Sequence, residues 1–235
     1  MLEISTLLAQ THRILVTGGA GFIGGAVIRR LLKDSQTVVF NLDKMGYASD
    51  LSGINSVLNS LGTEGANRHQ LLQVDLADAQ STMEAIEKAD PDLVLHLAAE
   101  SHVDRSIDSP SIFVNSNVLG TFNLLQAVQA HWEGLSGARQ SDFRFHHIST
   151  DEVFGSLGNE GYFSEKTSYD PRSPYSASKA ASDHLVNAWH HTYGLPAVVT
   201  NCSNNFGPWQ FPEKLIPVVI LKAIAYEQIP LYGDG

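Results

Sequence analysis

The feature that most constrains the fold is a glycine-rich turn between an apolar run and a segment with helical spacing. Residues 13–17 (RILVT) are mainly apolar, Gly18, Gly21 and Gly24 follow, and residues 22–32 repeat apolar side chains at helical intervals. Glycines allow a sharp turn, and the first turn of a helix offers free N–H groups to a phosphate. The spacing GxxGxxG in this context predicts a strand, a phosphate-binding turn and a helix.

Strand-like and helix-like segments alternate along the rest of the chain. We expect strands at 13–17, 37–43, 69–74, 92–97, 143–148 and 197–200, and helices at 22–32, 81–88, 111–131, 174–193 and 213–226. This order predicts an α/β fold, a Rossmann-like doubly wound parallel sheet with helices on both faces. Residues 45–68 and 155–172 show less pattern, although 51–61 could hold a helix.

Composition excludes several classes of protein. The chain has 235 residues, of which 43% are hydrophobic and 17% charged, which is typical of a globular protein. Its formal charge of −10 disfavours nucleic acid or an anionic membrane as partner. A single cysteine, Cys202, which we expect to be a buried strand thiol, and no signal peptide or membrane-length apolar run predict a cytoplasmic protein.

Asp43 ends the second expected strand, 19 residues after Gly24. A carboxylate at this place can accept hydrogen bonds from the ribose hydroxyls of an adenosine, which favours NAD over NADP. A glycine motif alone would also fit a flexible turn. Strand, turn, helix and acid in the right order make a dinucleotide site the better interpretation.

A second polar group follows the fifth expected strand. Thr150, Asp151 and Glu152 come at its end, and Tyr175 and Lys179 follow on an expected helix. Tyr175 and Lys179 are four residues apart and so share one helix face, where the cation would favour the phenolate. The set offers a base for an alcohol and two carboxyl groups for a second proton transfer.

Other residues at the expected ligand edge of the sheet permit two interpretations. Asp75 follows the third strand, and the small Ala98 and Ala99 would let a cofactor approach the backbone or would simply pack tightly. The loop after the fourth strand has polar residues that fit substrate contacts or a surface cluster equally well: His102, Asp104 and Arg105.

The ten histidines do not predict a metal site. His146 and His147 are neighbours in an expected strand and would point to opposite faces. The chain has no HExxH or comparable ligand spacing, so we predict no metal.

Taken together, the motifs resemble the extended short-chain dehydrogenase/reductases that act on nucleotide sugars, and among these the sugar-nucleotide 4,6-dehydratases. The matching segments are GGAGFIG (18–24), AAESHVDRS (98–106), STDEVFG (149–155), SPYSASK (173–179), NCSNNFGP (201–208) and FPEKLIP (211–217). The resemblance covers nearly the whole chain after residue 13. Its most specific part is the Thr-Asp-Glu triplet, since related epimerases and decarboxylases usually lack this acid pair.

The resemblance implies a dehydration of dTDP-glucose or UDP-glucose, the first being expected, to a 4-keto-6-deoxy sugar. Tyr175 would take the proton of the 4-hydroxyl while hydride passes to NAD, Lys179 would lower the pKa of Tyr175 and bind the nicotinamide ribose, and Thr150 would bond the 4-oxygen. Glu152 would then remove the proton on carbon 5, and Asp151 would protonate the departing 6-hydroxyl. Hydride finally returns to carbon 6.

The resemblance also implies the binding residues and a dimer. The expected NAD contacts are Gly18, Gly21, Phe22, Ile23, Gly24, Asp43, Lys44, Asp75, Leu76, Leu97, Ala98, Ala99, Ser101, Tyr175, Lys179 and Asn205. The expected sugar-nucleotide contacts are Ser101, Thr150, Asn204, Lys214, Leu215, Ile216 and Pro217. A homodimer would form through the helix from Ser111 to His131 and the helix from Pro174 to Tyr193.

We expect residues 1–12 to be an extension, 13–204 an NAD-binding domain with the catalytic residues, and 205–235 the start of an incomplete substrate-binding lobe. Members of the resembled family continue beyond this point into the rest of the lobe. Two alternatives stay open: a UDP-sugar 4-epimerase or decarboxylase of the same family, and a truncated NAD-binding protein with little activity.

Overall fold

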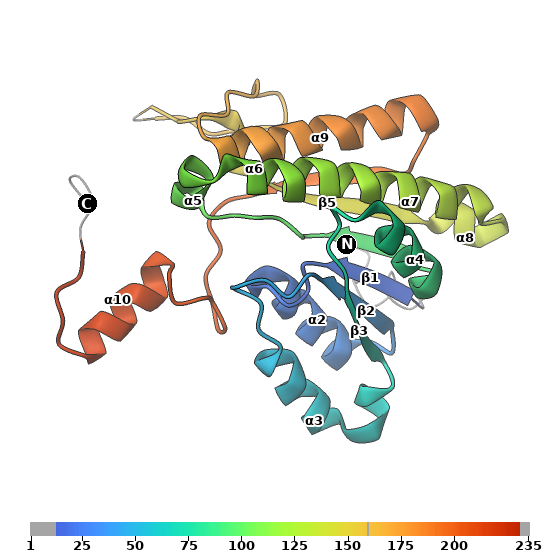
Figure 1. Cartoon of the computed structure of the whole chain (residues 1–235), viewed down its shortest axis with the longest axis horizontal. Helices are drawn as coiled ribbons and strands as arrows, with labels where there is room; N and C mark the ends of the chain where they lie inside the picture. The colour runs from blue at the N-terminus through green and yellow to red at the C-terminus, as the bar shows by residue number, and fades with distance from the viewer. Residues whose placement is uncertain (1–12, 159, 231–235) are drawn as a thin grey trace. The chain divides into compact units, whose positions relative to one another are not determined.

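The computed structural model describes residues 13–158 and 160–230. They divide into two compact units, one ending at Ser203 and the other beginning at Asn204. The first unit holds a six-stranded sheet in the order β3-β2-β1-β4-β5-β6, with all neighbouring strands parallel (Figure 1). The expected doubly wound α/β fold is confirmed. The expected extension, residues 1–12, lies outside the described residues.

The observed elements lie close to the expected ones. The strands are β1 (Arg13–Thr17), β2 (Val38–Asp43), β3 (His69–Gln73), β4 (Leu93–His96), β5 (Arg144–Thr150) and β6 (Ala197–Cys202). The helices are α2 (Phe22–Asp34), α3 (Ser52–Ala66), α4 (Ala79–Ala89), α5 (Val103–Asp108), α6 (Pro110–Phe113), η1 (Val114–Leu119), α7 (Gly120–Gly134), α8 (Gly137–Asp142), η2 (Asp151–Phe154), α9 (Pro174–Tyr193) and α10 (Leu215–Ile224).

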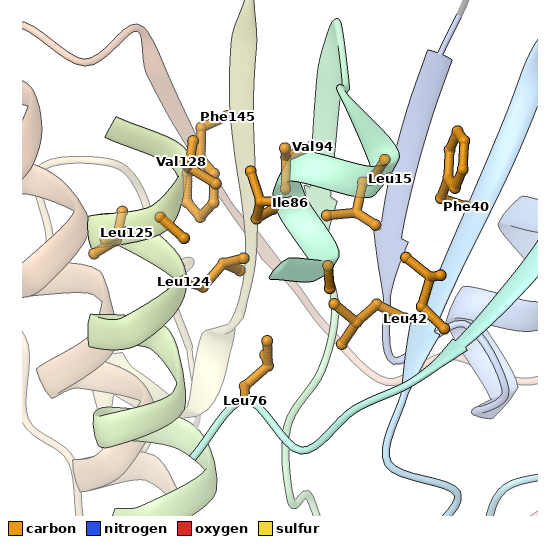
Figure 2. Close-up of a cluster of buried hydrophobic side chains, with 14 of the residues drawn as sticks. Leu15, Phe40, Leu42, Leu76, Ile86, Val94, Leu124, Leu125, Val128 and Phe145 are labelled. Atoms are coloured by element: carbon orange, nitrogen blue, oxygen red, sulfur yellow. The ribbon is translucent and has the colours of Figure 1, made fainter. Parts of the chain in front are cut away.

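The sheet separates two hydrophobic clusters. Ile14 and Val16 of β1 pack with side chains of α2 and α3, whereas Leu15 packs in the other cluster with α4 and α7 (Figure 2). Because successive side chains of a strand point to opposite faces, this alternation shows that helices cover both faces of the sheet. Both faces are therefore closed to ligands, and the ends of the strands are left for binding.

The order of the strands places the ligand edge. From β1 the chain builds outward to β2 and β3, then returns to start β4 on the other side of β1. The carboxyl ends of β1 and β4 meet where Thr17 pairs with His96. In open α/β sheets the crevice at this switch point is where ligands bind.

The largest difference from expectation is in the helix predicted at 111–131. The structure has α6, a π-helical segment η1 and α7 in succession. Asn117 of η1 bonds both backbone groups of Glu100 and the hydroxyl of Ser178. These partners are far away in sequence, so helical periodicity could not predict the wider turn. The short helices α5 and α8 were also not expected, and α3 continues beyond 51–61 only after a kink at Gly62, whose φ is +64°.

The second unit contains α10 and the turns before it. Beside α10 lies a cavity of about 400 Å³ lined mainly by apolar side chains: Gly207, Trp209, Gln210, Pro212, Ile216, Pro217, Ile220 and Leu221. Among the residues described here, no helix has both the length and the apolar character that a membrane crossing requires.

Candidate active site

The glycine turn after β1 fits against the end of β4. Gly18 has a φ of +68°, and a Cβ there would lie 2.7 Å from Cα of Ala98. A Cβ on Gly24 would overlap the carbonyl oxygen of Gly18. Gly21 precedes the first turn of α2 without a side-chain cap, so this helix start can offer its N–H groups to an anion. The turn has the shape that a pyrophosphate site requires.

Gly24→Ala tests this turn against a neighbouring control. We expect it to weaken NAD binding tenfold or more, because the added methyl group must displace the backbone of Gly18. Gly25→Ala is the control, since its Cβ would meet the flexible end of Arg29 at 3.3 Å. That change should leave affinity intact and stabilise α2 by roughly 0.5–1 kcal/mol. Isothermal titration with NAD and thermal unfolding measure both effects; equal losses of affinity would contradict the assignment.

Asp43 closes β2 beside this turn. It is buried, and its carboxylate accepts hydrogen bonds from Ala20 N at 3.0 Å, Met45 N at 2.8 Å and Ser49 Oγ at 2.8 Å. These bonds join the glycine turn to the loop after β2. Lys44, predicted to contact the cofactor, forms an ion pair with Glu100 at 2.6 Å.

The residues after β3 and β4 that are predicted to contact NAD lie at the same edge of the sheet as the glycine turn. Ala98 N donates to Thr17 Oγ1 at 3.1 Å, which holds the end of β4 against β1. The side chain of Leu76, in contrast, is part of the hydrophobic core (Figure 2). A contact from Leu76 to a cofactor would therefore have to come from its backbone. The roles of Asp75, Leu97 and Ala99 stay predictions.

The predicted catalytic residues come together at the carboxyl end of β5 and the start of α9. Thr150 ends β5, and its Oγ1 accepts a hydrogen bond from Glu152 N at 3.2 Å, which caps the short helix η2. Tyr175 lies in the first turn of α9, which begins with the expected Ser173 cap and Pro174. The side chain of Thr150 lowers the pKa of the Tyr175 hydroxyl, and the charges of Glu152 and Asp151 raise it.

Burial dominates the ionisation of Tyr175 and Lys179, the pair on α9. Burial and the nearby charge of Glu152 raise the pKa of Tyr175, and the hydrogen bond with Thr150 offsets only part of this effect. Lys179 is 4% exposed, and burial lowers its pKa to about 8. Its Nζ donates to Ile148 O at 2.9 Å. Burial thus dominates the pKa of Tyr175 in this structure, and the predicted lowering of that pKa by Lys179 stays a prediction.

Sequence reasoning missed a buried polar cluster beneath these residues. Asp183 of α9 contacts His147, Ser149 and Tyr169 through hydrogen bonds of 2.7–2.9 Å. The spacing of Asp183 four residues after Lys179 was the available signal, since it places both on one helix face.

The structure also places Cys202, Arg105 and the side chains that could bind a metal. Cys202 lies in β6 as expected but is partly exposed, and its Sγ donates to Ser149 O at 3.3 Å. Arg105 stacks over the ring of Tyr47 at 3.7 Å, which links the loops after β2 and β4. Within the described part of the chain, no three His, Cys, Asp or Glu side chains cluster as metal ligands.

Six of the predicted binding residues belong to the second unit. They are Asn204, Asn205, Lys214, Leu215, Ile216 and Pro217. Lys214 directly precedes α10, and the side chains of Leu215 and Ile216 are exposed. Their contacts with a cofactor or a sugar nucleotide stay predictions.

A model of the family described as GDP-mannose 4,6 dehydratase matches residues 15–235. The chain belongs to the GDP-mannose 4,6-dehydratase family. This membership confirms the resemblance to sugar-nucleotide dehydratases that the motifs indicate.

Similar curated proteins include dTDP-glucose 4,6-dehydratases from several bacteria. The Salmonella typhimurium enzyme is 49% identical over 232 residues, which cover 95% of this chain and 63% of that protein. The Neisseria meningitidis enzyme is 52% identical over 225 residues, covering 95% and 62%. The chain thus spans less than two thirds of the length of these curated relatives.

Solved structures give the same picture. The dTDP-glucose 4,6-dehydratase of Bacillus anthracis in complex with NAD has a TM-score of 0.81 at 36% identity, covering 95% of this chain and 65% of that one. A UDP-glucuronic acid 4-epimerase of Bacillus cereus, in complex with UDP-glucuronic acid and NAD, has a TM-score of 0.80 at 29% identity, covering 94% and 66%. The fold is common to both activities, whereas identity is higher with the dehydratase.

Proposed function

We propose that this chain binds NAD and carries the catalytic groups of a hydro-lyase that converts dTDP-glucose to its 4-keto-6-deoxy derivative. The observation that carries the proposal is the convergence of Asp151 and Glu152 with Thr150 and Tyr175 at the ligand edge of the sheet. An oxidation of an alcohol needs only the tyrosine. The acid pair supplies the additional acid and base that an elimination of water requires.

The crevice beside β1 fits NAD. A pyrophosphate can approach the backbone at Gly18, where a side chain would collide with Ala98, and the start of α2 offers N–H groups. Asp43 stands at the end of β2, where a ribose hydroxyl can donate to its carboxylate. Bound there, NAD would accept a hydride from carbon 4 of the sugar and return it to carbon 6.

Tyr175 and its neighbours would activate the 4-hydroxyl. Tyr175, as the phenolate, removes the proton from the 4-oxygen, and Thr150, whose side chain acts on the tyrosine hydroxyl, would donate a hydrogen bond to the same oxygen. Lys179 lies one turn away as a buried cation that stabilises the phenolate once it forms.

Glu152 and Asp151 would carry out the elimination. A 4-ketone makes the hydrogen on carbon 5 acidic, and Glu152 removes it as a general base. Asp151 protonates the 6-hydroxyl, which is a poor leaving group without that proton. Both side chains belong to η2, so the turn that Thr150 caps fixes their relative positions.

The direct test is incubation with NAD and either dTDP-glucose or UDP-glucose. A dehydratase lowers the mass of the sugar nucleotide by one water and gives a 4-keto product that absorbs in alkali. We expect this product from dTDP-glucose. An isomer of unchanged mass would support the epimerase alternative instead.

A second expectation concerns the length of the chain. Because the chain spans 63% of the length of its Salmonella relative, we expect the 235-residue polypeptide to bind NAD but to turn over substrate slowly. Equilibrium binding of NAD and a rate of product formation measure the two properties. A rate equal to that of a full-length relative would contradict this expectation.

We also propose a homodimer formed through α7 and α9 with the segments that precede α7. Helices α7 and α9 lie side by side (Figure 1), and the exposed residues Ile112, Val114 and Tyr193 give this region apolar character. Light scattering after gel filtration would show twice the mass of one chain; a monomer at all concentrations would contradict the proposal.

A cytoplasmic location is consistent with the single cysteine and stays a prediction.

A further inference from the structure

Asp183 lies at the centre of a buried polar cluster that the proposed reaction does not use. Its side chain is 0% exposed. Oδ1 lies 2.9 Å from Nε2 of His147, and Oδ2 accepts hydrogen bonds from the hydroxyls of Ser149 at 2.7 Å and Tyr169 at 2.9 Å. A buried carboxylate is unfavourable unless hydrogen bonds and an opposite charge compensate it. The three contacts with His147, Ser149 and Tyr169 provide the hydrogen bonds.

Lys179, one helical turn earlier, provides the opposite charge that compensates the buried carboxylate. Its ammonium is buried and donates to the carbonyl of Ile148, a neutral group that cannot balance its charge. Burial lowers the pKa of Lys179, and the charge of Asp183 raises it. Burial likewise raises the pKa of Asp183, and hydrogen bonds together with the charge of Lys179 lower it. Each group therefore stabilises the charged form of the other.

Other titratable groups surround this pair on several elements: His96 of β4, His147 of β5, Tyr169 of the loop before α9, His184 of α9 and Cys202 of β6. Burial and the charge of Lys179 hold the pKa values of His147 and His96 well below the usual range, so both are neutral.

Tyr169 does not replace the carboxylate of Asp183 as a source of negative charge. The pKa of Tyr169 is raised to about 12, so its hydroxyl is neutral, whereas Cys202 raises the pKa of Lys179 less than Asp183 does. His184 can add only positive charge. Asp183 is thus the stronger of the two groups that raise the pKa of Lys179.

The same carboxylate joins the two elements that carry the catalytic residues. His147 and Ser149 are two residues apart in β5, so their side chains point to the same face of the sheet. Thr150 follows directly after Ser149. Asp183 belongs to α9, the helix of Tyr175 and Lys179. Its hydrogen bonds therefore fix the end of β5 against α9.

We propose, on the basis of the function proposed above, that Asp183 is a positioning residue. Its buried carboxylate keeps Lys179 charged and holds the strand end with Thr150, Asp151 and Glu152 against the helix that carries Tyr175.

Titration of Lys179 by NMR tests the charge coupling without substrate or cofactor. The chain is labelled with ¹³C at the lysine Cε positions, and the Lys179 signal is assigned by its loss in Lys179→Met. We expect a midpoint near pH 8 in the unsubstituted chain. In Asp183→Asn the midpoint should fall by roughly one pH unit or more, which is a tenfold change in the ratio of charged to neutral lysine.

Tyr169→Phe is the matched control. It removes one hydrogen bond from the cluster and keeps the carboxylate, so it should lower the melting temperature but leave the midpoint of Lys179 unchanged. A folded Asp183→Asn chain with the midpoint of the unsubstituted chain would overturn the proposal. So would an equal shift in both variants, since a purely structural cluster would produce it.

The coupling can also be measured from the lysine side if Asp183→Asn does not fold. In Lys179→Met, labelled at the aspartate carboxyl carbons, the pKa of Asp183 should rise above its value in the unsubstituted chain. An unchanged value would overturn the proposal.

Activity gives a separate readout. Product formation should fall at alkaline pH as Lys179 loses its proton, and in Asp183→Asn this fall should occur at lower pH, with kcat reduced and KM for the sugar nucleotide unchanged. An unshifted alkaline limb would contradict the proposal. No product from the unsubstituted chain would instead contradict the proposed function, while the NMR titration still decides the coupling.

Discussion

Replacing Tyr175 by phenylalanine is expected to lower the rate of 4-keto-6-deoxy sugar formation by about 10²- to 10⁴-fold. Phenylalanine keeps the aromatic ring, which packs edge-on against Phe113, but has no hydroxyl to remove the proton of the 4-oxygen. NAD affinity and melting temperature should change little. The rate is measured by mass spectrometry of the product after timed incubation with dTDP-glucose.

Tyr193→Phe provides the control for this change. Tyr193 ends the same helix and is exposed, so loss of its hydroxyl should leave the rate unaltered. Equal rates for Tyr175→Phe and the unsubstituted chain would remove Tyr175 from the mechanism. Equal loss in both variants would indicate that α9 is disturbed as a whole.

Glu152→Gln is the second change with a large expected effect. The amide has nearly the shape of the carboxylate but cannot accept the proton of carbon 5, so product formation should fall by about 10²- to 10⁴-fold. Loss of its negative charge should also lower the pKa of Tyr175, since that charge raises it. Oxidation at carbon 4 should then survive while elimination stops.

Two measurements separate these steps. In deuterated water, product of the unsubstituted enzyme should gain deuterium at carbon 5, and Glu152→Gln should give almost no such product. Glu160→Gln is the control, because Glu160 is an exposed glutamate of the loop before α9. An unchanged rate of product formation in Glu152→Gln would exclude Glu152 as the base that removes the proton of carbon 5.

Much of the fold could be predicted because its signals are local. The apolar runs gave the strands, the spacing of apolar side chains gave the helices, and Ser173 with Pro174 located the start of α9, where the structure has a full capping box. The glycine turn was also readable, since a close approach of two backbones leaves no space for a side chain. The alternation of these elements then restricted the sheet to a parallel, doubly wound type.

The π-helical segment and the partners of Asp43 could not be predicted in this way. Asn117 of the π-helical segment bonds Glu100 in the loop after β4, and Ser49 donates to Asp43 from the loop after β2. Both arrangements depend on contacts between segments that the chain brings together only on folding.

The sequence by itself determined which chemical groups are present and at which strand ends they lie, because the order and spacing of the elements fix that placement. Only the tertiary structure decided how those groups ionise. Burial raises the pKa of Tyr175 and lowers that of Lys179, and their spacing along the chain shows neither effect. The carboxylate of Asp183 then opposes the loss of charge at Lys179. Ionisation depends on water exclusion and on distances between charges, and neither is a property of spacing along the chain.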